Sequence, residues 1–135
     1  MTLSFRAHLR RDDGQAMAEL ALVLPIMVAV MLGIVQFGII FNNYVTMTDA
    51  ARAGARKAAV SRFVADDGAA AKAVVYADAT SLNPAQLDVS VDASPDWATA
   101  GGDVTVTASY PYTINILGIV VKSGTLTTTT KERLE

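Results

Sequence analysis

The stretch that decides the fold is residues 20–41, LALVLPIMVAVMLGIVQFGIIF. It contains no charged residue, and Gln36 is its only strongly polar side chain. As an α-helix these residues would extend about 33 Å, whereas the hydrocarbon core of a bilayer is about 30 Å thick. The sequence therefore predicts one transmembrane helix, with Pro25 in its first two turns, where a missing N–H is best tolerated.

Two other interpretations of this apolar run are weaker. A buried core helix needs partner surface on all sides, and the rest of the chain is too short and too polar to supply it. A cleavable signal has an apolar region of only about 7 to 15 residues, followed directly by a small-x-small site. Here the nearest such site, Ala53-Gly54-Ala55, lies beyond Arg52. Charge does not orient the helix, because both flanks are equally basic: Arg6, Arg10 and Arg11 on one side, and Arg52, Arg56 and Lys57 on the other.

The composition excludes several classes of function. The chain has 135 residues and a formal net charge of −2, so it has the length of one domain and no basic field for a phosphate backbone. We expect no nucleic-acid partner. There is no cysteine, and the single histidine, His8, lies near the N-terminus, which excludes a Cys-based zinc site and a Ser-His-Asp triad in the C-terminal region. We expect no enzyme activity, no cofactor and no small-molecule substrate.

A charged leader precedes the apolar run and ends at a glycine. Gly14 is followed by Gln15, and Glu19 stands five residues after the glycine, at the mouth of the apolar helix. An ionised carboxylate that enters hydrocarbon is costly unless it is paired, so we expect a partner for Glu19. Cleavage after Gly14 would provide one, because the new α-amine of Gln15 could pair with Glu19 on the same chain or on a neighbour.

The segment that begins at Gly14 resembles a known class of proteins. Its opening, QAMAELALVLP, is similar to the class III signal of type IV pilins and pseudopilins. The continuation through AARAGARKAA resembles the TadE and TadF pseudopilins of the tight-adherence (Tad) pilus, over about residues 10 to 62. One departure is Leu20, which stands where many members carry an aromatic residue.

The resemblance implies a minor pseudopilin, a structural or priming subunit for pilus assembly, adhesion and biofilm formation. A prepilin peptidase would cut between Gly14 and Gln15, Glu19 would act in assembly, and the partners would be the pilin and other pseudopilins of the system. The chain would cross the bacterial cytoplasmic membrane once, with the N-terminus cytoplasmic and the C-terminal domain exported. The alternative is an uncleaved bitopic protein whose exported domain scaffolds a secretion complex.

Beyond residue 41 the helical pattern continues with smaller side chains. One stripe repeats at spacings of three and four: Tyr44, Met47, Ala51, Ala55, Ala58 and Ala59. Ala50, Gly54 and Ala58 also form a small-x-x-x-small row, which permits close approach of another helix. The partner of this row is either the chain's own domain or a neighbouring subunit. We expect a leader over 1–14 and a transmembrane and stalk helix over 15–62.

Residues 63–135 are expected to form a small exported domain. Asp66-Asp67-Gly68 can cap a second helix, AAAKAVVYADAT, which Asn83-Pro84 would stop.

Alternating apolar residues predict strands over 86–91 and 103–110, the second ended by Pro111. Ala93-Ser94-Pro95-Asp96 is expected to be a turn. An apolar run over 114–121 follows, and Lys122-Ser123-Gly124 is expected to turn into a last strand over 125–131. The fold class is therefore α+β: a long N-terminal transmembrane helix that continues into a stalk, a short helix, and a small antiparallel sheet of three or four strands.

Two features of the domain could suggest ligand binding, and each has a simpler interpretation. Four aspartates lie near a Gly-Gly turn, but their spacing fits no calcium loop; they are Asp88, Asp92, Asp96 and Asp103. We interpret them as solvated strand ends and turns, and we expect no metal site. Trp97 lies in a turn-rich loop, and we interpret it as a lid on a small core.

Overall fold

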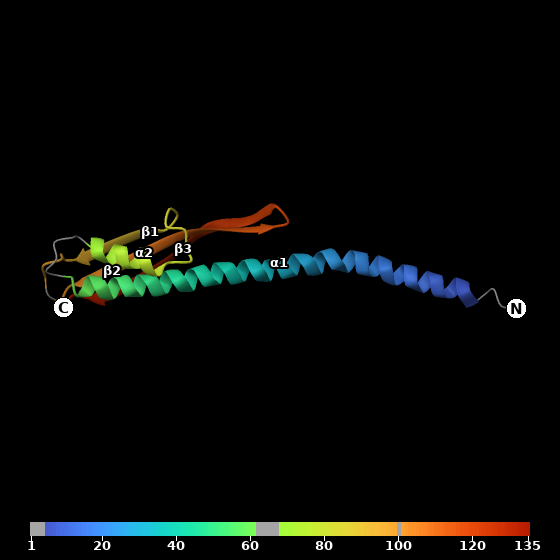
Figure 1. Cartoon of the computed structure of the whole chain (residues 1–135), viewed down its shortest axis with the longest axis horizontal. Helices are drawn as coiled ribbons and strands as arrows, with labels where there is room; N and C mark the ends of the chain where they lie inside the picture. The colour runs from blue at the N-terminus through green and yellow to red at the C-terminus, as the bar shows by residue number, and fades with distance from the viewer. Residues whose placement is uncertain (1–4, 62–67, 100) are drawn as a thin grey trace.

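A computed structural model of the chain describes residues 5–61, 68–99 and 101–135, with side chains from residue 14 onward. A single long helix, α1 (Phe5–Ala59), carries a small domain beside its C-terminal half (Figure 1). This domain contains α2 (Ala69–Asp78) and, within the described residues, three strands, β1 (Asp88–Ser94), β2 (Asp103–Ile116) and β3 (Ile119–Arg133). The expected α+β class is confirmed.

The apolar run and the stalk form one continuous helix that begins in the leader, at Phe5, and ends at Ala59. Its last carbonyls are satisfied by the chain that surrounds them, as helix ends require. The Ser61 hydroxyl donates to the Lys57 carbonyl at 2.6 Å, and the Glu135 N–H donates to the Ala59 carbonyl at 3.1 Å. The C-terminal end of α1 is thereby fixed to the domain.

Pro25 lies in the interior of α1, so the expectation that it occupies the first two turns was wrong. The reason is that α1 begins at Phe5, well before the apolar run. Because proline has no N–H, the carbonyl of Ala21 lacks its usual helical donor. Figure 1 shows α1 bending gently over its N-terminal half, as expected of a helix with an internal proline.

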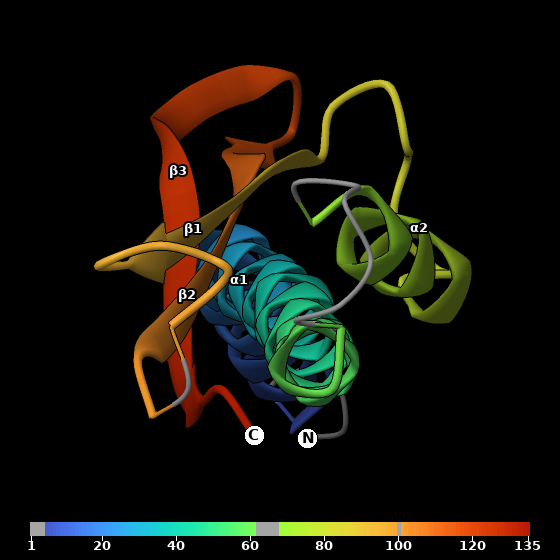
Figure 2. The ribbon, with the colours of Figure 1, turned by 90° about the vertical axis from the view of Figure 1, so that its left-hand side faces the viewer.

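The three strands form an antiparallel sheet in the order β1-β2-β3. On β2 the expected alternation is observed, because Val104, Val106 and Ala108 are fully buried whereas the residues between them are partly exposed. Seen along α1, both helices lie on the same side of the sheet (Figure 2). The fold is therefore two-layered, with one sheet face covered by α1 and α2.

β2 is longer than predicted, because Pro111 does not end it. Pro111 pairs with Thr125 of β3, and the strand continues to Ile116. Pairing with β1 stops at Ser109, so at Pro111 the β1 side of β2 is an open edge. Proline is tolerated on an edge, since the missing N–H needs no partner there.

The turn between the last two strands also lies elsewhere than predicted. It is formed by Leu117 and Gly118, whereas Lys122-Ser123-Gly124 belongs to β3. Gly124 faces Tyr112 across the ladder, and a Cβ at Gly124 would lie only 2.9 Å from the Tyr112 ring. This glycine therefore makes room for an aromatic ring within the strand and does not form a turn.

The smaller boundaries differ by a few residues. α2 ends at Asp78, before Asn83-Pro84, and its N-cap is Gly68, with a φ of 80°. Asp66 and Asp67 lie outside the described residues. β1 runs to Ser94, so the expected turn at Ala93-Ser94-Pro95-Asp96 begins later than predicted.

The predicted stripe of α1 forms one side of the core. Met47, Ala51, Ala55 and Ala58 are fully buried, whereas Tyr44 is 41% exposed and lies at the edge. These small side chains pack with Val75 of α2 and with the buried valines of β2 in a single cluster. Trp97 packs against this cluster from outside, so its interpretation as a lid is confirmed.

Candidate functional site: the N-terminal helix and its small-residue row

The N-terminal half of α1 has no contact that buries it within the described chain. Most of its large apolar side chains are exposed, with Leu22 at 74% and Phe37 at 69%, and none of those described is fully buried; Leu32 and Ile40 are partly buried. The most apolar 18-residue window has a mean hydropathy of 2.5, and none of it is buried. A helix that is apolar all round and uncovered is suited to lipid. This helix is therefore a single-pass membrane anchor.

Gly14, Gln15 and Glu19 come together at the start of this bare segment. The Gln15 side-chain amide donates to the Glu19 carboxylate at 3.0 Å, from one helical turn before it. In the intact chain the Gln15 nitrogen is part of a peptide bond, so this amide is the partner that Glu19 has in the structure. The Gly14-Gln15 bond lies within α1, Gly14 is exposed, and a Cβ added to it would meet no atom outside the adjoining helix backbone within 4 Å.

The small-residue row packs inside the chain. Ala50 and Ala58 are buried, and a Cβ added to Gly54 would lie within 2.4 Å of Val75 and 3.2 Å of the Ala71 carbonyl. Only a glycine permits α2 to approach this closely. Of the two partners that the sequence allowed for the row, the structure places the chain's own α2 against it.

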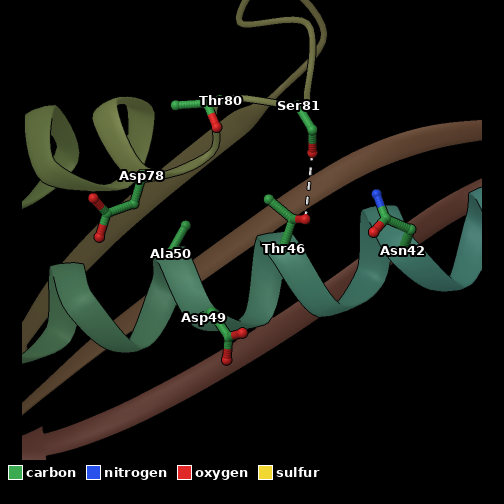
Figure 3. A pocket seen from close by; sticks show the side chains of 7 residues that line it. All are labelled: Asn42, Thr46, Asp49, Ala50, Asp78, Thr80 and Ser81. Carbon is green, nitrogen blue, oxygen red and sulfur yellow. Dashed lines mark hydrogen bonds between the residues drawn. The ribbon is translucent and has the colours of Figure 1, made fainter.

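A polar cavity of about 480 Å³ lies between α1 and the segment that follows α2, and no sequence motif indicated it. It is lined by Asn42, Thr46, Asp49, Ala50, Asp78, Thr80 and Ser81. Figure 3 shows Ser81 and Thr46 facing each other, and the Ser81 hydroxyl donates to Thr46 at 3.3 Å. Asp49 pairs with Arg52 at 3.2 Å. The lining of the cavity offers hydroxyls and carboxylates. The described residues contain no group of three or more His, Cys, Asp or Glu that could hold a metal ion.

The four aspartates of the domain do not converge. Asp88 pairs with Ser109 at one end of the β1-β2 ladder, and Asp103 pairs with Ser94 at the other. These ends are about 20 Å apart at the usual rise of a strand.

Asp96 is occupied by its own loop. Its carboxylate accepts hydrogen bonds from the N–H groups of Ala98 at 2.9 Å and Thr99 at 2.8 Å. Two hydrogen bonds from Thr99 lower the pKa of Asp96 below its ordinary value; the one from the side chain has the larger effect and the one from the backbone the smaller. Asp96 therefore stabilises a turn.

Comparison with known proteins assigns the helix to a family. Residues 14–56 match the model of the TadE-like protein family. The N-terminal helix is TadE-like. No curated protein and no solved structure matches the chain.

The TadE-like match over residues 14–56 confirms the resemblance on which the sequence analysis relied. The matched residues begin at Gly14 and include Gln15 and Glu19. They also include Ala50 and Gly54 of the small-residue row, whereas Ala58 lies beyond them. The family match thus covers the anchor and much of the stalk, while α2 and the sheet lie outside it.

Proposed function

We propose that this TadE-like protein is a minor pseudopilin, a structural or priming subunit for assembly of a Tad pilus, and through it for adhesion and biofilm formation. The observation that carries the proposal is a TadE-like match that begins at Gly14, followed by an exposed carboxylate, Glu19, at the start of a bare apolar helix. The role is non-catalytic: the protein acts through its contacts with the pilin and other pseudopilins.

Processing by a prepilin peptidase is the first step of this function. The peptidase cuts between Gly14 and Gln15 and removes the charged leader. A peptidase must bring the scissile carbonyl to its catalytic groups, and a side chain at Gly14 would obstruct that approach. Loss of the leader removes Arg10 and Arg11 from the helix end, which lowers the cost of drawing that end out of the membrane interface into an assembly.

Glu19 then serves assembly. When helices pack side by side, the Glu19 carboxylate leaves water and needs a partner, and the new α-amine of Gln15 on an adjacent chain is positively charged. The gain from such a pair is offset by desolvation, so its main effect is on register. Leaving one member unpaired in the packed state costs about 3 to 5 kcal/mol.

The proposed topology follows from the peptidase, which works at the cytoplasmic face. Residues before Gln15 are cytoplasmic, and the domain that carries α2 and the sheet is exported across the cytoplasmic membrane. A reporter active only outside the cytoplasm, fused after Glu135, should be active. Activity of a cytoplasmic reporter at this position would contradict the topology.

Mass spectrometry of the membrane-extracted protein tests processing. We expect a mature N-terminus at Gln15 in the native protein and an intact leader in Gly14→Leu. Gly33→Leu is the matched control, because Gly33 lies in the same helix and also has no atom within 4 Å of a Cβ. An intact leader on the native protein would instead support the uncleaved bitopic scaffold.

Two variants of Glu19 test assembly. Glu19→Ala removes the carboxylate, and Glu19→Gln keeps its size and hydrogen bonding but not its charge. Both proteins should be made, inserted and cleaved, because the apolar run is sufficient for insertion. Both should lose association with partner pseudopilins in pulldowns and lower the count of surface pili. Normal association and piliation in both would leave Glu19 without an assembly role.

A further inference from the structure

The turn between β2 and β3 forms an apolar tip that projects from the sheet. We define the hairpin tip as residues 114–121. β1 pairs with β2 only as far as Ser109, so the tip is a two-stranded ribbon that extends along α1 past the rest of the domain (Figure 1). Its large side chains are exposed: Leu117 at 69%, Ile119 at 70%, Val120 at 59% and Val121 at 62%. This is an apolar surface that the described part of the chain does not cover.

The tip lies level with the membrane-spanning segment. The side-chain amide of Gln36 donates to the carbonyl of Asn115 at 3.2 Å, across 79 positions of sequence. Gln36 is five residues before Phe41, the end of the apolar run, which is about 7 to 8 Å along the helix. An interfacial segment typically buries its apolar face about 5–10 Å into the boundary between headgroups and acyl chains. Asn115 is therefore at interfacial depth when α1 spans the bilayer. The ribbon continues past Asn115 toward the N-terminus of α1 (Figure 1), so the turn at Leu117 and Gly118 lies about 7–10 Å deeper.

The same contact satisfies two polar groups that lipid would otherwise leave unpaired. Gln36 is the only strongly polar side chain of the apolar run, and polar groups in a bilayer usually find a protein partner. The carbonyl of Asn115 provides that partner. The hairpin tip and α1 can therefore enter the membrane interface together, with these two polar groups hydrogen-bonded to each other.

The turn itself is unfavourable in water. Leu117 has a φ of 52° and Gly118 a φ of 86°, the two left-handed residues of a two-residue hairpin turn. Asn-Gly or Asp-Gly is preferred there, and a residue other than glycine, Asn or Asp is unfavourable in this conformation. An exposed leucine in this position is unfavourable both in backbone conformation and in hydration. Contact with an apolar phase would remove the hydration cost, which leaves only the backbone cost.

We propose that the hairpin tip inserts into the phospholipid interface of the membrane that α1 spans. Lipid is the partner because it surrounds α1 at the level of Gln36, which places acyl chains and headgroups beside the tip. Both edges of the ribbon are open, and unpaired backbone groups are not tolerated in hydrocarbon. The base of the tip, around Asn115, therefore lies among the headgroups with the exposed ammonium of Lys122 near the phosphates, and only Leu117 and Ile119 at the turn reach the acyl chains.

This inference rests on the membrane-spanning role of α1 and adds a second membrane contact from the exported domain. The domain would then be held at two points, by the stalk and by the tip, and its height and tilt relative to the membrane would be fixed.

Fluorescence quenching by brominated phosphatidylcholine tests the proposal in the full chain. Trp97 is the only tryptophan, so Trp97→Phe gives a background in which one tryptophan can be placed at will. We compare Leu117→Trp in the tip, Met31→Trp in α1, and Thr127→Trp, an exposed position of β3 paired with Ser109. Each protein is reconstituted in vesicles with and without bromine on the acyl chains.

We expect bromine to reduce the emission of the Leu117→Trp and Met31→Trp proteins and to leave that of Thr127→Trp unchanged. Quenching of Met31→Trp without quenching of Leu117→Trp would overturn the proposal and leave the anchor intact. A blue-shifted, unquenched Leu117→Trp whose emission reverts on dilution with empty vesicles would indicate a second copy instead of lipid. An unquenched Met31→Trp would overturn the membrane span itself.

A second variant separates insertion from folding of the turn. Leu117→Asn suits the left-handed conformation, so the hairpin should form at least as well as in the native chain. Combined with Ile119→Trp as the probe, it should show less bromine quenching than Ile119→Trp alone. Unchanged quenching would overturn the role given to Leu117.

Discussion

The two halves of α1 are one helix built for two surroundings. Met31, in the N-terminal half, is 64% exposed, whereas Met47, in the C-terminal half, is fully buried. The first half has large apolar side chains on every side, and the second has a narrow stripe of alanines on one side. The difference shows that the surrounding phase sets the pattern: lipid needs no particular face, but a protein partner needs a single close-packed one.

The small side chains of the second half determine how close its partners come. Ala51 and Ala55 add little apolar area, but they let the sheet and α2 approach the helix backbone. Gly54 does the same for α2 at the closest point. Stability in this half therefore depends on the fit between surfaces and on the few larger residues that fill the space between the layers.

The largest difference in stability between variants of the two halves should appear when one methionine in each half is replaced by alanine. Met47→Ala leaves a cavity in the core and should reduce the free energy of unfolding of the domain that contains α2 and the sheet by about 2–5 kcal/mol. Met31→Ala should leave it unchanged. Denaturant unfolding of the full chain in micelles, followed by Trp97 emission, measures both. Equal losses in the two proteins would remove the distinction between the halves.

The next effect comes from adding the same side chain to a glycine in each half. Gly54→Val would force α2 away from α1 and should destabilise the domain by about 1–3 kcal/mol. A Cβ added to Gly38 would meet no atom within 4 Å, so Gly38→Val should unfold like the native protein in the same assay. If Gly54→Val were equally stable, the close approach of α2 would not be needed for the fold.

A smaller effect should follow when the contact between Gln36 of the bare half and the hairpin is removed. Gln36→Leu removes the bond to the Asn115 carbonyl, and about 0.5–1.5 kcal/mol is typical of such a bond. Amide hydrogen exchange should become faster in residues 114–121 only. Asn115→Ala is the matched control, because the contact is made by the backbone carbonyl and survives it. Faster exchange in both variants would assign the effect to the turn.

The smallest effect should come from the Asp96 turn, which follows β1 in the domain that packs on the second half of α1. Because folding lowers the pKa of Asp96 from its ordinary value of 3.8, its contribution to stability is present above pH 3.8 and is lost as the pH falls through the lowered value. Asp96→Asn cannot titrate. The native protein should therefore be slightly more stable than the variant at pH 7, and this difference should shrink below pH 3.8. A constant difference across this range would contradict the assignment.

Much of this architecture could be predicted from local patterns. The apolar run predicted the membrane anchor, and the spacing of Met47, Ala51 and Ala55 predicted the buried stripe of α1. The alternation of apolar and polar residues predicted β2. The turn at Leu117 and Gly118 could not be found in this way. Lys122-Ser123-Gly124 has the composition of a turn, but it lies in β3 because Gly124 accommodates Tyr112 across the ladder.

The functional residues divide in the same way. Gly14, Gln15 and Glu19 are near one another in sequence, so a resemblance to pilins was sufficient to single them out. The contact of Gln36 with Asn115 joins residues 79 positions apart and depends on the length and bend of the hairpin. Only the three-dimensional arrangement gives the level of the tip relative to the apolar run.

The alignment of the strands with α1 has a mechanical consequence. β2 and β3 run along the helix (Figure 1) and pair from Asp103↔Arg133 to Ile116↔Ile119. Ladder hydrogen bonds are perpendicular to their strands, so tension directed along α1 loads them in shear, many at once, and does not open them one after another. A domain built in this way resists pulling along the helix better than pulling across it.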